Sequence, residues 1–533
     1  MSEIDRRAFL ILTGQSAALL GLGLPGIARA DSLEIPVSAS GDNEWEFYHP
    51  GVYNVQDSKL MRALQEYLAA INKNNANVNV QDLIAGKLEN QSGIERPAAV
   101  TGKYMETIYE RYGNRNQLFH DKAYASKTKY GRVIAFPLIL QPEVWPGTEG
   151  KPEGMADYML VNGINCTNNY YKPFYEGDTL FQVNANQRCV DITPAAGSHY
   201  RTLALSGTCK TYNQKGELVS ESACMLKESY RRHKDPAKRN PSGKRAWESP
   251  DWWQRKPHQY TDKDWETIIA FWKAEVYRGE EPLYWDDVNV GDQPAPRVAG
   301  PFLADEAGVD MLFNSPGWSS NIKYNVLTPE IFAKMVKNQQ GIWVPAEYQE
   351  KKPKGQGSGG NMDRLEAAIS SAGPQGPGGP GGPPPGQQGK QVPETSEIAN
   401  RDGRAVIQNA VCAKWVAGML INWIGDQGWL QRIGWDIMSL PPGYPESVVP
   451  PITKEMMPAQ FDRFPYMDKV PFMRGCRAAW HALEGDAILC HAYVTDKYAN
   501  DGEYFVNLSW WCQTLDQYIV EEGSATVKLP KRA

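Results

Sequence analysis

The chain has 533 residues and a formal net charge of -6 at pH 7, with charges of both signs. This length allows about two to four domains, and the lack of a basic stripe argues against nucleic acid as the main partner. The 17 Trp, 26 Tyr and 14 Phe are consistent with a large apolar pocket, although aromatic side chains more often fill cores.

The N-terminus has the pattern of an export signal. Arg6 and Arg7 precede a short apolar run rich in glycine and alanine, which ends in a small-x-small site at Ala30. This predicts a signal peptide over residues 1–30 that is cleaved after Ala30. The paired arginines resemble the twin-arginine type, which carries folded proteins across a bacterial inner membrane, although Asp5 stands where that type has Ser or Thr. We therefore expect a periplasmic protein that meets a membrane only during export; a frayed cytosolic helix fits the pattern less well.

The cysteines leave two interpretations open. They are Cys166, Cys189, Cys209, Cys224, Cys412, Cys476, Cys490 and Cys512. No CxxC motif or Cys/His cluster has metal-ligand spacing, so we expect no zinc site. No GxGxxG motif or Walker loop occurs in a context that supports nucleotide binding, and we expect no bound cofactor. In an oxidising periplasm some of these cysteines can pair, and buried free thiols are the equally weighted alternative.

Two helices are predicted ahead of the first sheet. Leucines at helical spacing predict a helix over Ser58–Asn72, capped by Asp57 or Ser58, within an N-terminal extension that spans residues 31–95. A second helical stretch covers about residues 104–112.

Residues 113–137 follow, and they are the leading candidate for a chemical site. Turn-forming residues precede Asp121, which stands where a helix would start. Small and aromatic residues come next, and then an apolar exit that resembles a strand.

Three apolar runs, near 179–192, 200–212 and 217–230, predict an antiparallel meander, with a turn signal at 213–216. Landmarks of this region recur about 300 residues later in the same order, which indicates an internal duplication. The pairs are Glu176-Gly177-Asp178 with Glu484-Gly485-Asp486, Ser206-x-x-Cys209-x-Thr211 with Ser509-x-x-Cys512-x-Thr514, and Ser222-Ala223 with Ser524-Ala525. The second copy then needs its own helix, and an apolar stripe predicts one over Ala405–Ile433.

The predicted organisation therefore has two α+β units, each with a central helix wrapped by antiparallel sheet, which is a double hotdog pattern. After the signal and the extension, the predicted parts are hotdog domain 1 (96–233), a helical connector (234–283) with a helix over 261–277, and hotdog domain 2 (284–533) with a flexible Gly/Pro-rich insert at 352–393.

Four stretches resemble the MaoC-like acyl dehydratases that carry an N-terminal domain of the fatty-acid-synthase dehydratase type. They are residues 113–125, ending in Asp121, Tyr124 and Ala125; Tyr212–Glu217; Tyr260 to Asp292, including Arg278-Gly279 and Tyr284–Val288; and Asn422–Leu430 together with Ala525–Pro530. Together they span about residues 100–530.

The resemblance implies reversible addition of water to a 2-enoyl thioester, with a helix N-terminus to hold the thioester oxyanion. In the family, an Asp and a His five residues apart share the acid/base work. Here Asn114 and Phe119 occupy those two positions, and Gln117 replaces the proline of the motif. Neither an amide nor a phenyl ring can act as a general base.

The candidate catalytic residues are therefore displaced from the family pattern. They are His120, Asp121, Asn114 and, in the second copy, Asp402. The simpler role for Asp121 is to cap the helix, and His120 can equally be an outward surface residue.

These observations favour a periplasmic hydratase or dehydratase that acts on an enoyl thioester, such as a coenzyme A thioester, or on a bulky apolar substrate without a thioester. The alternatives are a non-catalytic ligand-binding or partner subunit and a cytosolic thioester hydratase. The resemblance also implies that the protein can form a homodimer.

Overall fold

The computed structural model describes residues 44–95, 97–102, 105, 115–137, 158–160, 164–193, 197–238, 246–248, 255–302, 322–346, 404, 411–436 and 481–532. The predicted signal peptide, the insert at 352–393 and the helical stretch at 104–112, apart from Met105, lie outside these residues. Asn114 and Asp402 do so as well.

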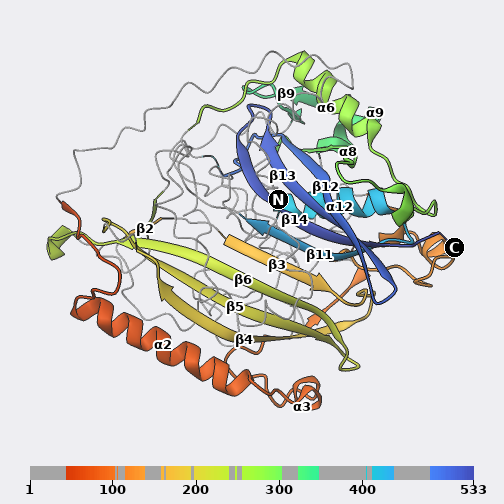
Figure 1. The fold of residues 1–533 in the computed structure, drawn as a ribbon. Coiled ribbons are helices and arrows are strands. Elements are labelled where there is room, and N and C mark those ends of the chain that lie inside the picture. The colour runs from red at the N-terminus through yellow and green to blue at the C-terminus, as the bar shows by residue number, and fades with distance from the viewer. Residues whose placement is uncertain are drawn as a thin grey trace. The chain divides into compact units, whose positions relative to one another are not determined.

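In the described residues, a sheet of twelve strands forms the framework (Figure 1). Its strands are β1 (Ala98–Ala99), β2 (Tyr158–Leu160), β3 (Ile164–Tyr170), β4 (Thr179–Asp191), β5 (Arg201–Asn213), β6 (Leu218–Arg231), β7 (Ala246–Glu248), β8 (Arg297–Ala299), β11 (Trp429–Asp436), β12 (Ile488–Asn500), β13 (Glu503–Thr514) and β14 (Ile519–Leu529). The main path runs β1-β4-β5-β6-β3-β11-β14-β13-β12-β8, while β2 pairs with β6 and β7. The predicted meander is confirmed as β4, β5 and β6.

The strand order repeats itself in mirror image about the β3–β11 pair, as an internal duplication requires. Strands β4, β5 and β6 correspond to β12, β13 and β14, and β3 and β11 meet in antiparallel register with Cys166 opposite Trp435. The duplicated landmarks also share local geometry. Gly177 and Gly485 have φ angles of 89° and 87°, a left-handed conformation that glycine adopts without steric cost. The fold is therefore α+β, with two hotdog halves in one continuous sheet.

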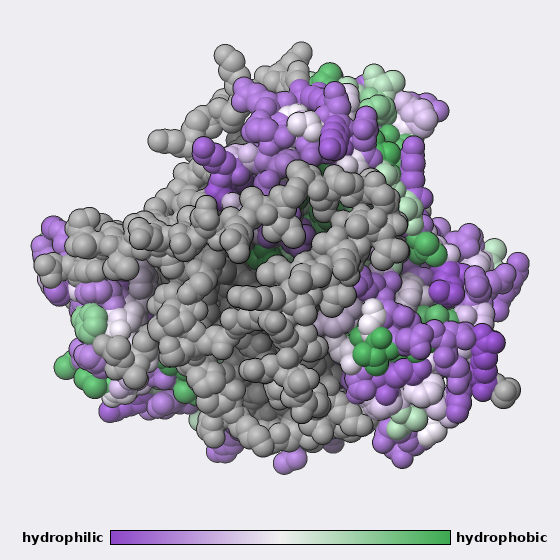
Figure 2. Space-filling model, turned by 45° about the horizontal axis from the view of Figure 1, so that its top comes forward, coloured by the Kyte–Doolittle hydropathy of each residue, from purple (hydrophilic) through white to green (hydrophobic). Residues whose placement is uncertain are grey.

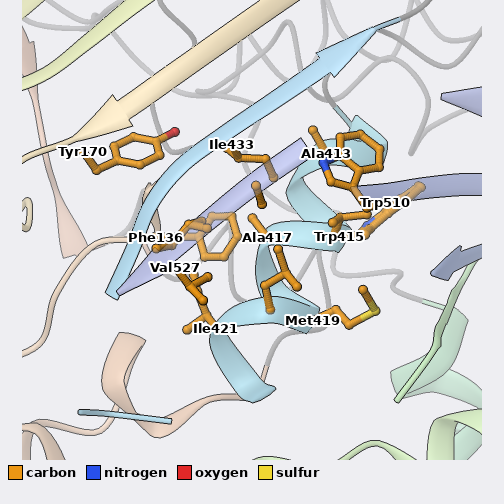
Figure 3. Close-up of a cluster of buried hydrophobic side chains, with 14 of the residues drawn as sticks. Phe136, Tyr170, Ala413, Trp415, Ala417, Met419, Ile421, Ile433, Trp510 and Val527 are labelled. Carbon is orange, nitrogen blue, oxygen red and sulfur yellow. The ribbon is translucent and has the colours of Figure 1, made fainter. Parts of the chain in front are cut away.

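The central helix of the second half is α12 (Val411–Ile424), and 13 of its 14 residues are buried. A helix that is apolar on every side belongs in a core. Its neighbours include Ile433 from β11, Trp510 from β13 and Val527 from β14, as Figure 3 shows. Phe302 stacks on Trp415 with ring centroids 4.5 Å apart.

The predicted helix over Ala405–Ile433 was wrong at its C-terminal end. Helix α12 stops at Ile424 because Gly425 adopts a left-handed φ of 67°, and Trp429 already begins β11. Residues 405–410 lie outside the described part. In the first half, the α-helix that the structure describes within residues 113–137 is α5 (Lys122–Ala125), which is only four residues long.

The N-terminal extension packs its helix α2 (Val55–Asn75) against β4 and β5, and Figure 1 shows α2 running along these strands. The predicted helix is confirmed, but its cap was wrong: Asn54 accepts a hydrogen bond from the Asp57 amide, so the helix begins earlier. Leu64 and Leu68 contact Leu205 of the sheet. A short helix, α3 (Val80–Ile84), follows.

The connector contains α6 (Asp262–Ala274), where Thr261 and Asp264 form a capping box, as the Thr261 signal predicted. Trp272 of α6 donates a hydrogen bond to the Val298 carbonyl of β8. The remaining described elements are α8 (Ile322–Leu327), α9 (Pro329–Phe332), the two-stranded sheet of β9 (Met335–Lys337) and β10 (Trp343–Pro345), and 3-10 turns at Gln117–Phe119, Pro236–Lys238 and Trp285–Asp287.

Both interpretations of the cysteines occur in the described residues. Cys166 and Cys224 form a disulfide between β3 and β6. Cys189, Cys209, Cys412, Cys490 and Cys512 do not belong to a disulfide, and Cys476 lies outside the described residues.

The described surface in Figure 2 is mainly hydrophilic with separate hydrophobic groups. Within the described ranges, no helix combines the length and the apolar character that crossing a membrane requires.

Candidate functional site

The leading segment folds as two short capped turns. Asn116 accepts a hydrogen bond from the Leu118 amide and starts the 3-10 turn Gln117–Phe119. Asp121 then accepts one from the Tyr124 amide at 2.9 Å and caps α5. The Asp121 carboxylate therefore fixes the position of Tyr124.

Of the predicted catalytic residues, the structure describes His120 and Asp121, and the Asp121 side chain caps α5. His120 is exposed, with its Nε2 atom 3.3 Å from the Arg115 carbonyl oxygen. Phe119, at the position of the family histidine, is 5% exposed and meets the Phe136 ring edge-on. Asn114 and Asp402 lie outside the described residues.

The same segment reaches the C-terminal end of α12 in the other half of the sheet. The Asn116 side-chain amide donates to Asn422 Oδ1 at 3.1 Å. The Tyr124 hydroxyl donates to Asp426 Oδ2 at 2.5 Å. Lys129 Nζ donates to the Gln427 carbonyl oxygen at 2.9 Å. Two stretches that lie about 300 residues apart in sequence are thus held together by side-chain hydrogen bonds.

A third segment encloses this meeting point. The Arg278 amide and its Nε atom donate to the Asn422 and Trp423 carbonyl oxygens, and the Asp426 amide donates to the Gly279 carbonyl at 2.8 Å. A Cβ at Gly425 would lie 2.9 Å from the Gly279 carbonyl oxygen, so only glycine fits this approach. Three of the four stretches that carry the family resemblance therefore meet at Asp426.

The environment of Asp426 is unfavourable for a carboxylate. Asp426 is 2% exposed, and this burial raises the pKa of its carboxyl group. It also follows the C-terminus of α12, where the helix dipole disfavours negative charge. Among the described residues, its Oδ1 atom has no hydrogen-bond partner.

The partner hydroxyl has a raised pKa as well. Burial, followed by the hydrogen bond to Asp426 and its charge, raises the pKa of Tyr124, so this half-buried phenol stays protonated. The pair thus combines a donor hydroxyl with a carboxylate that still has one oxygen available to accept a proton. A perturbed acid that stability does not explain is typical of a functional site.

Within the described ranges, no group of three or more His, Cys, Asp or Glu residues is arranged to hold a metal ion.

Sequence reasoning missed the Tyr124–Asp426 pair. Both residues lie in stretches that carry the resemblance, but the family pattern places the acid/base groups at the Asp and His positions instead. One signal was available: Asp426 directly follows Gly425 at the end of a long apolar helix, where a lysine or arginine would be favoured.

Comparison with other proteins gave structural likenesses only. No protein-family model matches the chain, and a search of curated proteins found no relative. Among solved structures, the chain is similar to a putative MaoC domain protein dehydratase from Chloroflexus aurantiacus, at 12% identity and a TM-score of 0.39, covering 83% of this chain and 95% of that one. It is also similar to RV0216, a conserved hypothetical protein from Mycobacterium tuberculosis with a double hotdog fold, at 11% identity and a TM-score of 0.37, covering 83% and 98%. A third is the R-hydratase PhaJ1 from Pseudomonas aeruginosa, at 16% identity and a TM-score of 0.17, covering 24% and 75%.

Because these sequence identities and TM-scores are low, the fold is assigned from the strand order of this chain. That order makes this chain a double-hotdog protein, and the roles of its residues depend on its own geometry.

Proposed function

We propose that the protein is a hydro-lyase that adds water reversibly to a carbon–carbon double bond, with Tyr124 and Asp426 as its acid/base pair. The observation that carries this proposal is the buried hydrogen bond between the two residues, formed where three family-like stretches meet. The family resemblance supplies the reaction class, and the pair supplies the groups that Asn114 and Phe119 cannot.

The chemistry needs one base for water and one donor for the carbon next to the activating group. The Oδ1 atom of Asp426 accepts the proton of the attacking water as the new C–O bond forms. Tyr124 gives its hydroxyl proton to the neighbouring carbon and takes back a proton from Asp426, so both groups return to their starting states. The raised pKa of Asp426 brings this carboxyl group closer to neutral pH, where proton transfer is most effective.

A second assignment of roles keeps the sequence candidates His120, Asp121, Asn114 and Asp402. The two assignments can be tested separately, because they place the acid/base groups on different side chains. In the structure, Asp121 caps α5 and His120 is exposed. Under the first assignment Asp121 is a positioning residue that holds Tyr124.

The proposed substrate is a 2-enoyl thioester or a bulky apolar molecule with an activated double bond. We include the substrate without a thioester because we also propose export to the periplasm by a twin-arginine signal, and coenzyme A thioesters are cytosolic. The Cys166–Cys224 disulfide supports export, since disulfides persist in oxidising compartments. A mature N-terminus at Asp31 in a periplasmic fraction is the expected result, and a full-length cytosolic chain would refute it.

The test is hydration of a short 2-enoyl thioester, together with deuterium exchange from heavy water into the same probe. Asp426→Asn and Tyr124→Phe should each lower the rate roughly 100-fold or more, while the double variant His120→Ala with Asp121→Asn should lower it far less. The exposed Asp82→Asn serves as a matched control for loss of one carboxylate. A full rate in Asp426→Asn and a large loss in the double variant would favour the second assignment.

One observation favours a non-catalytic protein instead. Phe119 packs against Phe136 in the core at the position of the family histidine, so this position serves the core. A ligand that is retained through purification, without turnover of either probe, would support this ligand-binding alternative. A homodimer stays a proposal for either function.

A further inference from the structure

Three free thiols meet in the core of the second half. Cys412 belongs to α12, Cys490 to β12 and Cys512 to β13, and their exposures are 2%, 0% and 0%. The Sγ atoms of Cys490 and Cys512 are 3.5 Å apart, and Cys412 hydrogen-bonds to Cys512. These thiols lie near the first turn of α12, at the opposite end from Asp426.

Cys490 and Cys512 lie directly opposite each other on adjacent antiparallel strands. Such neighbours have Cα atoms about 4.5–5.5 Å apart, which falls in the range that a disulfide spans, about 4.4–6.8 Å. Neither strand therefore has to move far for the two sulfur atoms to bond.

The first half contains a comparable pair that is already bonded. Cys166 and Cys224 are directly opposite on β3 and β6, and they form a disulfide with a Cα–Cα distance of 4.2 Å. The pairs occupy different strands of the two halves, so the second is not a simple copy of the first.

We propose that Cys490 and Cys512 are a second disulfide site, which is oxidised by exchange with a small-molecule disulfide of the oxidised-glutathione class. One protein thiolate attacks a sulfur of the small disulfide, which forms a mixed disulfide and releases one thiol. The other protein thiolate then attacks the protein sulfur of that mixed disulfide and releases the second thiol. The two protein thiols lose two electrons and two protons, and the small disulfide takes up both as two thiols.

The exchange requires that the β12–β13 hairpin opens, because neither sulfur atom is exposed in the folded chain. We therefore expect oxidation during folding or under mildly unfolding conditions. In the folded, reduced chain the pair should resist the same reagent.

Cys412 is the remaining thiol of the group. It approaches the pair from the helix rather than from the sheet. The hydrogen bond with Cys512 lowers its pKa, but burial, the charges of Glu521 and Cys490 and a hydrogen bond with Glu521 together raise the pKa of the Cys412 thiol to about 12. Because Cys412 lies on α12 and not on the β12–β13 hairpin, the bond should form between the two strands.

Digestion with trypsin distinguishes the three cysteines, since it places each of them in a separate peptide. Cys412 falls in residues 405–414, Cys490 in 478–497 and Cys512 in 498–528. The full chain is reduced, freed of reductant and incubated with oxidised glutathione in guanidinium just below its unfolding transition. It is then alkylated in strong denaturant, digested without reduction and analysed by mass spectrometry.

The expected product is peptide 478–497 linked to 498–528, with 405–414 alkylated. The variant Cys412→Ser should keep the link, and Cys490→Ser should abolish it. The proposal fails if Cys490 and Cys512 are both alkylated, if Cys512 carries only glutathione, or if the link contains peptide 405–414. The Cys166–Cys224 link in the same digest confirms that the oxidant was active.

Discussion

The two halves of the sheet share one strand framework but bury different chemistry against it. In the first half, α2 covers β4 and β5 and inserts Asp57 between Arg201, Arg232 and the Tyr230 hydroxyl. In the second half, α12 fills the core with apolar side chains, and its Cys412 meets the thiols of Cys490 on β12 and Cys512 on β13. The strand order does not determine what lies inside, and the Tyr124–Asp426 pair forms where the halves meet.

The duplicated Asp178 and Asp486 show the same divergence within one turn. Each carboxylate accepts a hydrogen bond from a backbone amide three residues earlier, at 2.8 and 2.7 Å. The second partner differs: Gln214 donates to Asp178, whereas the buried Arg255 donates to Asp486. The two copies therefore share the turn but differ in the second partner of the aspartate, which is neutral in the first copy and charged in the second.

The largest effect on stability should come from Asp57, which holds α2 to the first half. Asp57→Ala leaves two arginines buried with less compensation, so we expect a loss of about 3–5 kcal/mol in the free energy of unfolding, measured with guanidinium. The matched Asp82→Ala removes an exposed pair with Lys87 and should cost less than about 1 kcal/mol. Equal losses would mean that the buried network does not anchor α2.

The duplicated turns give a direct comparison of the halves. Asp486→Asn removes the charge that Arg255 requires and should cost about 3 kcal/mol, while Asp178→Asn loses only neutral partners and should cost about 1 kcal/mol. Urea unfolding of both variants measures the difference. Similar costs would show that the turn, rather than the ion pair, dominates.

The helix caps outside the two cores should have smaller effects. Asn54→Ala at α2 and Thr261→Ala at α6 each remove a side-chain acceptor from a backbone amide, so each should lower stability by about 1 kcal/mol. Thermal unfolding of both variants checks this value. A loss above about 3 kcal/mol would indicate a role beyond capping.

The smallest effect is a pH dependence at His258. The hydrogen bond to Asp516, together with the charges of Asp516 and Asp264, raises the pKa of His258. A raised pKa in the folded state means that the stabilisation is present below the unfolded value of about 6.5 and is lost as the pH rises through the folded pKa.

Unfolding at pH 6 and pH 9 measures this contribution. The wild type should lose more stability between the two values than His258→Gln, by less than about 1 kcal/mol because the pair is partly exposed. The same pH dependence of stability in wild type and His258→Gln would exclude a contribution from His258.

Sequence patterns were sufficient for the regular parts of the fold. The spacing of leucines predicted α2, alternating runs predicted β4 to β6, and the repeated landmarks predicted the second copy of those strands. The end of α12 was missed because the apolar stripe was followed past Gly425 to Ile433, whereas Gly425 adopts a left-handed φ and a turn at residues 426–427 leads into β11.

The candidate site could be predicted only in part. The sequence showed that the usual Asp and His are missing, at Asn114 and Phe119. It could not show that Tyr124 hydrogen-bonds to Asp426, because the two residues are 302 positions apart in sequence and meet only when the two halves fold together. It also could not show that the Asp426 carboxylate is buried. Local patterns carry no information about such long-range pairing.

The pH profile of kcat/KM on a 2-enoyl thioester tests the central claim most directly, since it reports the pKa of the essential base in the free enzyme. Wild type should show an ascending limb above the ordinary range of an aspartate, which lies near 3.9, because burial raises the pKa of Asp426. Asp426→Asn should lose both that limb and most of the rate. An unchanged limb and rate in Asp426→Asn would contradict the assignment of Tyr124 and Asp426 as the acid/base pair.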